Sequence, residues 1–264
     1  QLNYMWRRDA SQWANSAPIL FPIVGALKND TCVINGKEYH MTQHGFARHN
    51  EFETNQVSDT EVIFSLKSND EIIKQYPFLF ELNVTYRLVE NKLKCHIEVK
   101  NTDHQPIYFQ VGGHPAFACP FMENESSNDY YLEFSENETC NRKIIDVEKR
   151  GMSRVEKPFF DNEKRFFVRQ ELFNTDAIVI KNFKSENIAL KSLNHDKSIV
   201  FHMNGFDHVG LWAAKHVGGL IAIEPWVGHA DYTDFNGEFK EKESCVELPV
   251  GKNFEVEFAV EINQ

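Results

Sequence analysis

Three short segments of the chain each place a proton-exchanging side chain beside glycine or proline. His114 lies in the segment GGHPAF, Glu224 in the segment IEPW and His44 in the segment QHGF. Glycine permits backbone angles that other residues avoid and proline fixes one of them, so these neighbours hold a side chain in a set direction. Imidazole and carboxyl groups are the usual side chains of general acid–base catalysis. The three segments therefore predict a site that transfers protons.

Glu224 follows the apolar run LIAI, which spans residues 220–223. Partial burial disfavours a charged carboxylate and raises its pKa toward the range useful to a general base. Strand ends are also the places where the loops of a β-protein open clefts. We therefore expect Glu224 at the edge of a cleft, where it acts as a base.

Each candidate also has an ordinary structural interpretation. A histidine between glycine and proline, such as His114, is commonly a turn residue bonded to the backbone, and a strand-end carboxylate such as Glu224 commonly forms an ion pair. Arg48 is either a site residue or a surface charge paired with Glu51, and Asp176 is either a site residue or the cap of a turn. Residue types alone leave these alternatives open.

Aromatic residues next to the polar segments are equally open to two interpretations. Phe46, Phe117 and Trp226 belong either to the core or to a binding surface. An aromatic face beside polar groups is how sugar sites cover the apolar C–H side of a ring.

The chain has no HxH or HExxH metal motif, no GxSxG hydrolase motif, and no GxGxxG or P-loop nucleotide motif. The segment 232–243 copies part of a calcium loop, but its first ligand position is Tyr232, which lacks a carboxylate. We expect neither a metal nor a cofactor.

Charge and cysteine content narrow the class of protein. The formal charge of −11 and the absence of any basic run longer than Arg7-Arg8 exclude a nucleic-acid backbone binder. No apolar run approaches the ~18 residues of a membrane-spanning helix. An odd number of cysteines without a CxxC pair indicates reduced thiols, and hence a cytoplasmic protein. The cysteines are Cys32, Cys95, Cys119, Cys140 and Cys245.

Alternating apolar and polar residues predict a fold made mostly of strands. The pattern is clearest over 81–90, 92–100 and 254–262, and Glu90-Asn91 reads as the turn of a hairpin between the first two. The 22 phenylalanines among 264 residues suit a sheet-rich core. Shorter apolar runs, bounded by turn residues, cover residues 62–66, 130–134, 177–181, 188–191, 198–203 and 220–226.

Helical candidates are brief, at 9–14 and 69–76, and the charged stretch 121–165 looks like a long solvated excursion. We therefore predict an all-β protein, a large antiparallel β-sandwich with few short helices, forming one domain over 1–264. Because the chain starts at Gln1, we expect a preceding segment in the native protein.

Six segments in a fixed order carry a resemblance to a known family. They are NYMW, SAPILFPIVG, QHGFAR, GGHPAF, DAIVI and IEPWVGHAD. In this order they resemble the aldose 1-epimerases, or galactose mutarotase-like proteins, and within them the short bacterial LacX-type branch. The resemblance implies a sugar cleft and the interconversion of the α and β anomers of a free hexose, without cofactor or metal. It assigns the general acid to His114 and the general base to Glu224.

The resemblance also assigns substrate contacts to Gln43, His44, Arg48 and Asp176. Many relatives carry an arginine where this chain has Ala26, so Arg48 is expected to be the only arginine of the pocket. That disfavours a phosphorylated sugar, because phosphate is usually held by paired arginine donors. Hexose-6-phosphate 1-epimerisation and sugar binding or regulation without turnover remain as alternatives. The chain is expected to act as a monomer or homodimer.

Overall fold

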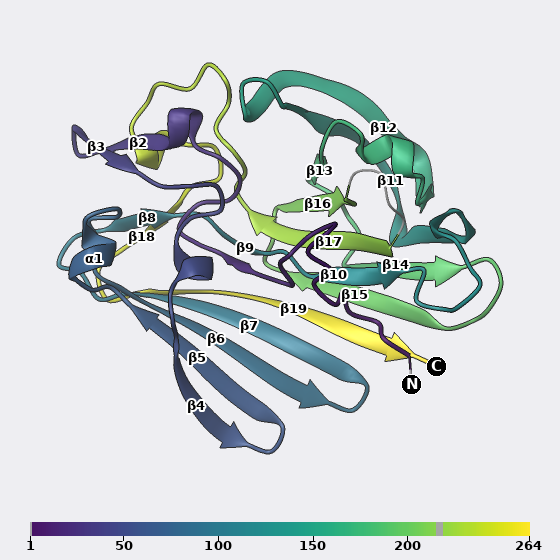
Figure 1. Ribbon diagram of the computed structural model, residues 1–264. Coiled ribbons are helices and arrows are strands. Elements are labelled where there is room, and N and C mark those ends of the chain that lie inside the picture. Colours follow the sequence, from purple (N-terminus) through teal and green to yellow (C-terminus); the bar gives the residue numbers. More distant parts are fainter. Residues whose placement is uncertain (1, 215–218) are drawn as a thin grey trace.

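The computed structural model describes residues 2–214 and 219–264, and strands dominate it (Figure 1). The helical elements are α1 (Asp70–Ile73) and the 3-10 turns η1 (Lys28–Asp30), η2 (Ala47–His49), η3 (Ser127–Asp129), η4 (Gln170–Phe173) and η5 (Phe239–Glu241). The strands are β1 (Ile19–Leu20), β2 (Thr31–Ile34), β3 (Lys37–His40), β4 (Glu53–Ser58), β5 (Glu61–Lys67), β6 (Phe80–Val89), β7 (Lys92–Asn101), β8 (Ile107–Phe109), β9 (Val111–Gly113), β10 (Ala116–Cys119), β11 (Tyr130–Asp146), β12 (Gly151–Phe167), β13 (Ile178–Lys181), β14 (Asn187–Ser192), β15 (Ser198–Asn204), β16 (His208–Trp212), β17 (Gly219–Val227), β18 (Val246–Leu248) and β19 (Asn253–Asn263).

One 15-stranded sheet organises the chain. Its strands follow the order β1-β9-β17-β16-β13-β11-β14-β15-β19-β7-β6-β5-β4, with β10 beside β17 and β12 beside β11. Two-stranded sheets pair β18 with β8 and β2 with β3. All of these pairings are antiparallel. The predicted antiparallel all-β fold is confirmed.

The predicted central hairpin is present as β6 and β7. Leu82 and Val84 on β6, and Cys95 and Ile97 on β7, are buried because alternate residues of a strand face the same side. The connection at Glu90 adopts a φ of 55°, as a tight hairpin turn requires. On its other edge β7 pairs with β19, which confirms the third predicted strand.

The stretch 121–165 is not the loose excursion that its charge suggested. Most of it forms the long hairpin β11–β12, at the upper right of Figure 1. Many of its side chains are exposed, but the backbone N–H of Met152 donates to the carbonyl of Asp231 over 2.7 Å and fastens the hairpin to the rest of the chain. The charges are the solvent face of a strand pair, and the tip of this pair reaches the functional site.

One of the two predicted helices forms. Asn69 caps α1 by accepting the N–H groups of Glu71 and Ile72, both at 3.0 Å. The helix predicted at 9–14 is wrong: Asp9 accepts the N–H of Ser11 instead and folds the segment into a turn. Within residues 2–214 and 219–264, no helix is long and apolar enough to span a membrane.

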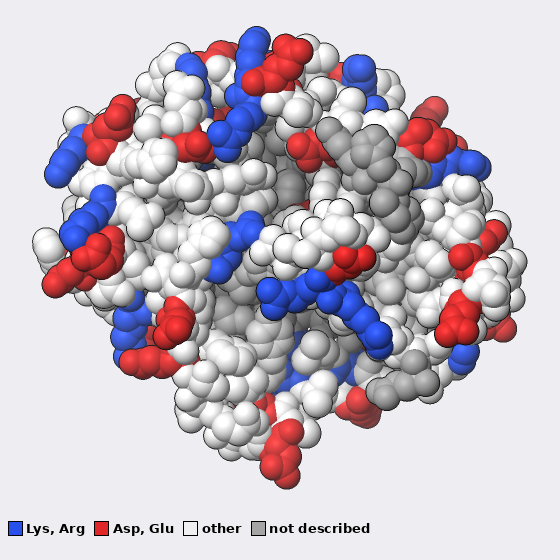
Figure 2. Space-filling model, in the orientation of Figure 1, with Lys and Arg blue, Asp and Glu red and all other residues white. Residues whose placement is uncertain are grey.

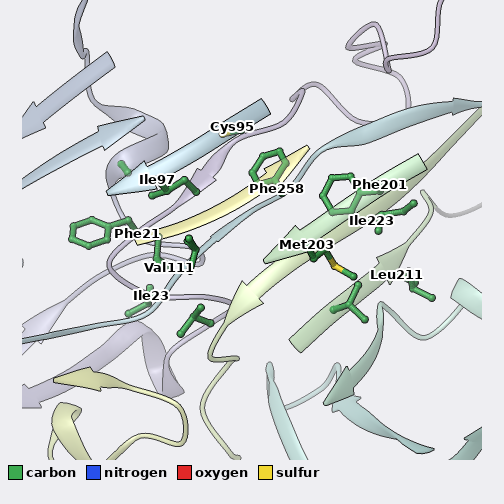
Figure 3. Close-up of a cluster of buried hydrophobic side chains, with 14 of the residues drawn as sticks. Phe21, Ile23, Cys95, Ile97, Val111, Phe201, Met203, Leu211, Ile223 and Phe258 are labelled. Atoms are coloured by element: carbon green, nitrogen blue, oxygen red, sulfur yellow. The ribbon is translucent and has the colours of Figure 1, made fainter. Parts of the chain in front are cut away.

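Aromatic and aliphatic side chains from distant parts of the sheet share one core (Figure 3). Phe21 is fully buried and contacts the rings of Phe80 and Phe109 at centroid distances of 4.9 and 5.6 Å. Phe201 and Phe258, from β15 and β19, meet at 5.4 Å. Burying each such side chain contributes about 1.5–3 kcal/mol. This core packs strands from several parts of the long sheet against the segments that carry the polar motifs.

The segments FPIVG and QHGF lie against each other at the edge of this core. The His44 N–H donates to the Gly25 carbonyl at 2.9 Å, and the Ala47 N–H to the Phe21 carbonyl at 3.2 Å. Gly45 has a φ of +71°, and a Cβ there would lie 2.2 Å from the Phe21 carbonyl oxygen. Only glycine fits this crossing, which fixes the direction of the neighbouring His44.

Basic and acidic side chains are interspersed over the face shown in Figure 2. Pairs such as Arg165 with Glu133, at 2.6 Å, and Lys94 with Glu257, at 3.0 Å, link neighbouring strands. Among the residues described on this face, lysine and arginine do not gather into one extended patch.

The contact at Gly45 leads to a stability prediction. Gly45→Ala should lower the free energy of unfolding by about 1–2 kcal/mol for its left-handed backbone. The clash with the Phe21 carbonyl should add about 1–3 kcal/mol. Gly36→Ala is the matched control, because its φ of +74° is the same but nothing lies within 4 Å of the added Cβ. Urea denaturation of both variants should show the larger loss for Gly45→Ala, and equal losses would contradict the clash.

Candidate active site

A single cavity brings together all six residues that the sequence assigned to a site. Its volume is about 360 Å³, at the lower end of the range for small-molecule pockets. The six residues along its wall are Gln43, His44, Arg48, His114, Asp176 and Glu224.

Strands β9 and β17 bring His114 and Glu224 together. His114 directly follows β9, and its N–H donates to the carbonyl of Pro18 over 3.0 Å. Glu224 lies in β17, opposite Gly210 of β16. Because β9 pairs with β17, residues far apart in sequence are set side by side at the floor of the cavity.

His114 and Glu224 are in direct contact. The Nε2 atom of His114 lies 3.2 Å from Oε2 of Glu224, and the residues are 8% and 1% exposed. Oε2 of Glu224 and Nδ1 of His114 are buried and have no hydrogen-bond partner among the described residues. The contact is therefore close but poorly aligned for a hydrogen bond, and it leaves capacity for a ligand.

Burial sets the protonation of this pair. It raises the pKa of Glu224 well above the ordinary carboxyl value, and the nearby Asp176 carboxylate raises that pKa further. Burial also lowers the pKa of His114 to about 3, and the Arg48 charge acts in the same direction. Desolvation thus favours a neutral imidazole beside a protonated carboxyl, as the sequence predicted for Glu224.

His44 is held as a neutral imidazole of defined tautomer. Its Nδ1 accepts the N–H of Gly25 at 3.1 Å, so its proton belongs on Nε2. That Nε2 lies 3.3 Å from the amide nitrogen of Gln43. Two donors face each other there, so the Gln43 amide has to turn its oxygen toward His44 to accept this proton. Burial, followed by the charges of His114 and Arg48, lowers the pKa of His44 well below its usual value. The φ of His44 is +68°, a conformation rare outside glycine.

Asp176 also has an unusual backbone conformation. Its φ is 142°, and its Oδ1 accepts the N–H of Ala177 at 2.7 Å. Such strained residues persist where the surrounding structure holds them, and they cluster at ligand sites. Asp176 therefore lines the cavity and also forms the turn that its sequence context suggested.

Tryptophans enclose His114, and two of them were not predicted. The ring of Trp13 stacks on His114 at a centroid distance of 4.7 Å, and that of Trp212 meets it edge-on at 5.7 Å. Trp226 lines the same cavity, whereas Phe46 and Phe117 belong to the core. Tryptophan is rare in this chain, with four copies, and that rarity is the only sequence signal for Trp13 and Trp212.

The prediction that Arg48 is the only arginine of the pocket is wrong. Arg150, from the tip of the β11–β12 hairpin, also lines the cavity. It is held by Asp30 through two hydrogen bonds of 3.0 and 3.1 Å. Arg48 has no carboxylate partner among the described residues, so the suggested pair with Glu51 is not formed, and burial lowers the pKa of its guanidinium.

Ala26 lines the cavity where many relatives were expected to carry arginine. Lys28 does not replace that arginine, because its Nζ donates to Oδ1 of Asn236 at 2.7 Å, outside the cavity wall. The site therefore combines an acid–base pair, amide and carboxylate groups, one unpaired guanidinium and flat aromatic faces. This combination suits a small ligand that has several hydroxyl groups and an apolar ring face.

The sequence of this chain is similar to those of known proteins over most of its length. The sequence profile of the aldose 1-epimerase family matches residues 1–247. The plasmid and chromosomal LacX proteins of Lactococcus lactis subsp. lactis are each 35% identical over 241 residues, which covers 86% of this chain and 78% of theirs.

Solved structures agree with the sequence match. The galactose mutarotase related enzyme of Lactobacillus acidophilus superimposes with a TM-score of 0.93 and 30% identity, covering 99% of this chain and 87% of that chain. A galactose mutarotase-like protein of Lactobacillus casei ATCC 334 gives a TM-score of 0.90 and 30% identity, covering 98% and 89%.

The raised pKa of Glu224 predicts a pH-dependent stability. A carboxyl whose pKa is raised by folding stabilises the native state fully below its ordinary pKa, and this contribution is lost as pH rises through the raised value. Glu224→Gln removes that loss, so the variant should gain stability over the parent protein as pH rises. Thermal unfolding across a pH series measures the difference, with the exposed Glu247→Gln as control. A difference that shrinks as pH rises would contradict the assignment.

Proposed function

Because the chain belongs to the aldose 1-epimerase family, we propose that it interconverts the α and β anomers of a free hexose, with His114 as acid and Glu224 as base. The observation that carries the proposal is the 3.2 Å contact between these two side chains in the wall of the cavity. The ring oxygen and the anomeric hydroxyl of a sugar are bonded to the same carbon. An acid and a base that serve these two oxygens therefore have to reach the same small region of the sugar, which the two neighbouring side chains can do.

Ring opening needs two coupled proton transfers. Imidazolium His114 donates a proton to the ring oxygen while carboxylate Glu224 takes the proton of the anomeric hydroxyl. The bond between the anomeric carbon and the ring oxygen breaks, and the carbon–oxygen double bond of the aldehyde forms. After rotation about the bond to the next carbon, the same transfers in reverse close the ring on the other face.

The desolvated pair favours the opened sugar. Ring opening converts imidazolium and carboxylate into neutral His114 and neutral Glu224, which are the forms that burial stabilises. The direct contact between the two groups also lets a single proton shift from Glu224 to His114 before the reaction begins. One shared proton therefore serves the whole cycle, and the pair titrates as a unit.

The remaining polar residues are suited to hold the sugar hydroxyls. Asp176 accepts hydrogen bonds, Arg48 donates them, and the amide of Gln43 does both. The ordered tautomer of His44 supplies one further donor at Nε2 unless Gln43 uses it. Trp13 and its neighbouring tryptophans offer flat faces to the apolar side of the ring.

Loss of either catalytic group should abolish most of the acceleration. Glu224→Gln and His114→Asn should each lower kcat/KM by about 10²–10⁴-fold, because each removes one positioned proton transfer. The measurement is the polarimetric decay of freshly dissolved α-glucose or α-galactose. His40→Gln, an exposed histidine on β3, is the control and should keep full activity.

Two outcomes would overturn this assignment. A parent protein that leaves the decay at the rate in water, yet binds the sugar saturably in calorimetry, would be a sugar-binding protein without turnover. Parental rates in Glu224→Gln would remove Glu224 from the reaction.

A hexose 6-phosphate is the second candidate substrate. The supporting observation is Arg48, a half-buried guanidinium that has no carboxylate partner among the described residues. The second arginine of the pocket, Arg150, is neutralised by Asp30 and offers little further attraction to a phosphate. One unpaired arginine favours a hydroxyl contact over bidentate capture of a dianion by several donors.

Substrate competition distinguishes the two candidates. Glucose should compete for the site at least as well as glucose 6-phosphate, and Arg48→Met should weaken hexose binding about tenfold or more, the effect of losing a charged hydrogen bond. Arg87→Met, at an exposed pair with Glu61, is the control. A strong preference for glucose 6-phosphate that disappears in Arg48→Met would instead establish the phosphorylated sugar.

A further inference from the structure

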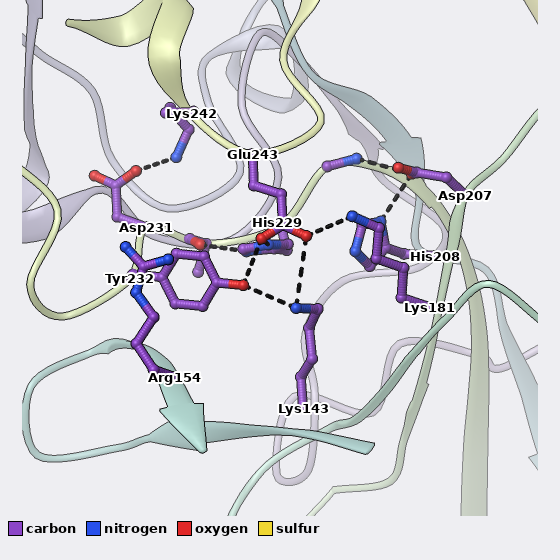
Figure 4. Close-up of polar contacts among 12 residues, drawn as sticks. Lys143, Arg154, Lys181, Asp207, His208, His229, Asp231, Tyr232, Lys242 and Glu243 are labelled. Carbon is purple, nitrogen blue, oxygen red and sulfur yellow. Dashed lines mark hydrogen bonds and ion pairs between the residues drawn. The ribbon is translucent and has the colours of Figure 1, made fainter. Parts of the chain in front are cut away.

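A second cluster of ionisable side chains lies outside the sugar cavity (Figure 4). His208 belongs to β16, His229 follows β17 and Glu243 follows η5. One ring nitrogen of each histidine and a carboxylate oxygen of Glu243 all lie within 4.8 Å of one another. The histidines are 0% and 2% exposed, whereas the side chain of Glu243 is 31% exposed, so the cluster joins two buried imidazoles to a partly exposed carboxylate.

Hydrogen bonds fix the tautomers of both histidines. Nδ1 of His208 lies 2.8 Å from Oδ1 of Asp207, and Nδ1 of His229 lies 2.6 Å from the carbonyl oxygen of Ala230. A carbonyl oxygen can only accept, and Oδ1 of Asp207 also accepts the N–H of Gly228 at 3.2 Å. Both Nδ1 atoms are therefore placed to donate, which leaves each Nε2 atom for another partner.

These two Nε2 atoms have unused bonding capacity. Each is buried, and neither has a hydrogen-bond partner among the described residues. Oε2 of Glu243 lies 3.6 Å from Nε2 of His229. Two buried ring nitrogens that have no partner among the described residues therefore lie close to a carboxylate oxygen.

We propose that His208, His229 and Glu243 bind a divalent transition-metal ion such as zinc. Imidazole nitrogen and carboxylate oxygen form a common ligand set for zinc, with a solvent molecule as the fourth ligand. Histidine ligands characteristically donate their other ring N–H to a carboxylate or a backbone carbonyl, as His208 and His229 do here. The inference does not depend on the proposed sugar reaction, which requires no metal.

The lysines around Glu243 determine which of its two carboxylate oxygens is available to a metal ion. Lys181 contacts Oε1 directly, and Lys143 lies 3.6 Å from the same oxygen. Tyr232 donates its hydroxyl to Oε2 at 2.5 Å and accepts Lys143 Nζ at 2.8 Å. An ion bound through Oε2 leaves Oε1 with its lysines. Repulsion from two ammonium groups limits the affinity, and removal of one of them should increase it.

A metal ion at this site would stabilise one wall of the sugar cavity from the side that faces away from the cavity. His208 lies opposite Trp226 in the β16–β17 pairing, and Trp226 lines the cavity. Tyr232 packs in one small cluster with Trp226 and with Met152 of the β12 strand. The ion would join the segment after β17 to β16, in a structural role.

Cobalt(II) is the probe, because its visible ligand-field absorption reports coordination directly. Titrating the untagged, EDTA-treated chain with cobalt chloride should give saturable absorption at one ion per chain, which zinc should displace. Saturating metal should also raise Tm, since an ion that binds only the native state stabilises it. His208→Gln and His229→Gln should weaken binding by more than the about 10–100-fold typical of losing an outer-shell partner. His202→Gln, at the surface pair with Glu261, is the matched control.

Lys181→Met keeps the proposal testable if the histidine variants do not fold. It retains all three ligands and removes a competing cation, so it should bind cobalt more tightly than the parent protein. No saturable absorption in the parent protein would overturn the site. So would binding that is unchanged in the folded His208→Gln and His229→Gln variants, or binding that is not strengthened in Lys181→Met.

Discussion

The contact between the buried His114 imidazole and the buried Glu224 carboxyl is the constraint on which the site depends. Neither group would keep its altered proton affinity in solvent, because the shifts come mainly from desolvation. The surroundings therefore have to exclude water and also hold the two groups within 3.2 Å. Trp13 and Trp212 cover the imidazole, while β17, buried between β9 and β16, carries the carboxyl.

The long sheet supplies the rigidity that this contact needs. The pairing of β9 with β17 sets the separation of His114 and Glu224, and the phenylalanine core beneath them resists displacement. The glycine crossing at Gly45 adds His44 to the same wall. On the opposite side the tip of the β11–β12 hairpin, anchored through Arg150 and Asp30, closes the cavity. Two guanidinium groups therefore line the cavity of this acidic chain, and that of Arg150 is already paired with Asp30.

Local sequence patterns predicted much of this arrangement. Period-two alternation located β6, β7 and β19, because a half-buried strand leaves that pattern in any sequence. The same rule misjudged 121–165, because many side chains of the β11–β12 hairpin are exposed and charged and its buried residues, such as Leu132 and Phe160, are widely spaced. Residues 9–14 misled for a different reason: the Asp9 side chain bonds to the backbone and competes with helix formation. Trp13, Trp212 and Arg150 had no local signal, because their positions depend on segments far away in the chain.

The sequence by itself determined the strand-rich class and singled out His44, His114 and Glu224, because alternation, glycine and proline act over a few neighbouring residues. The resemblance to the family added Gln43, Arg48 and Asp176 to the residues that line the cavity. The tertiary structure alone decided how close those residues lie, which of them are desolvated and in which direction their pKa values move. It also decided that Lys28 does not supply the cavity with the positive charge of the arginine that Ala26 replaces. In addition, it brought His208, His229 and Glu243 together. Distances and dielectric surroundings arise from the pairing of strands that are distant in sequence, and short motifs carry no information about that pairing.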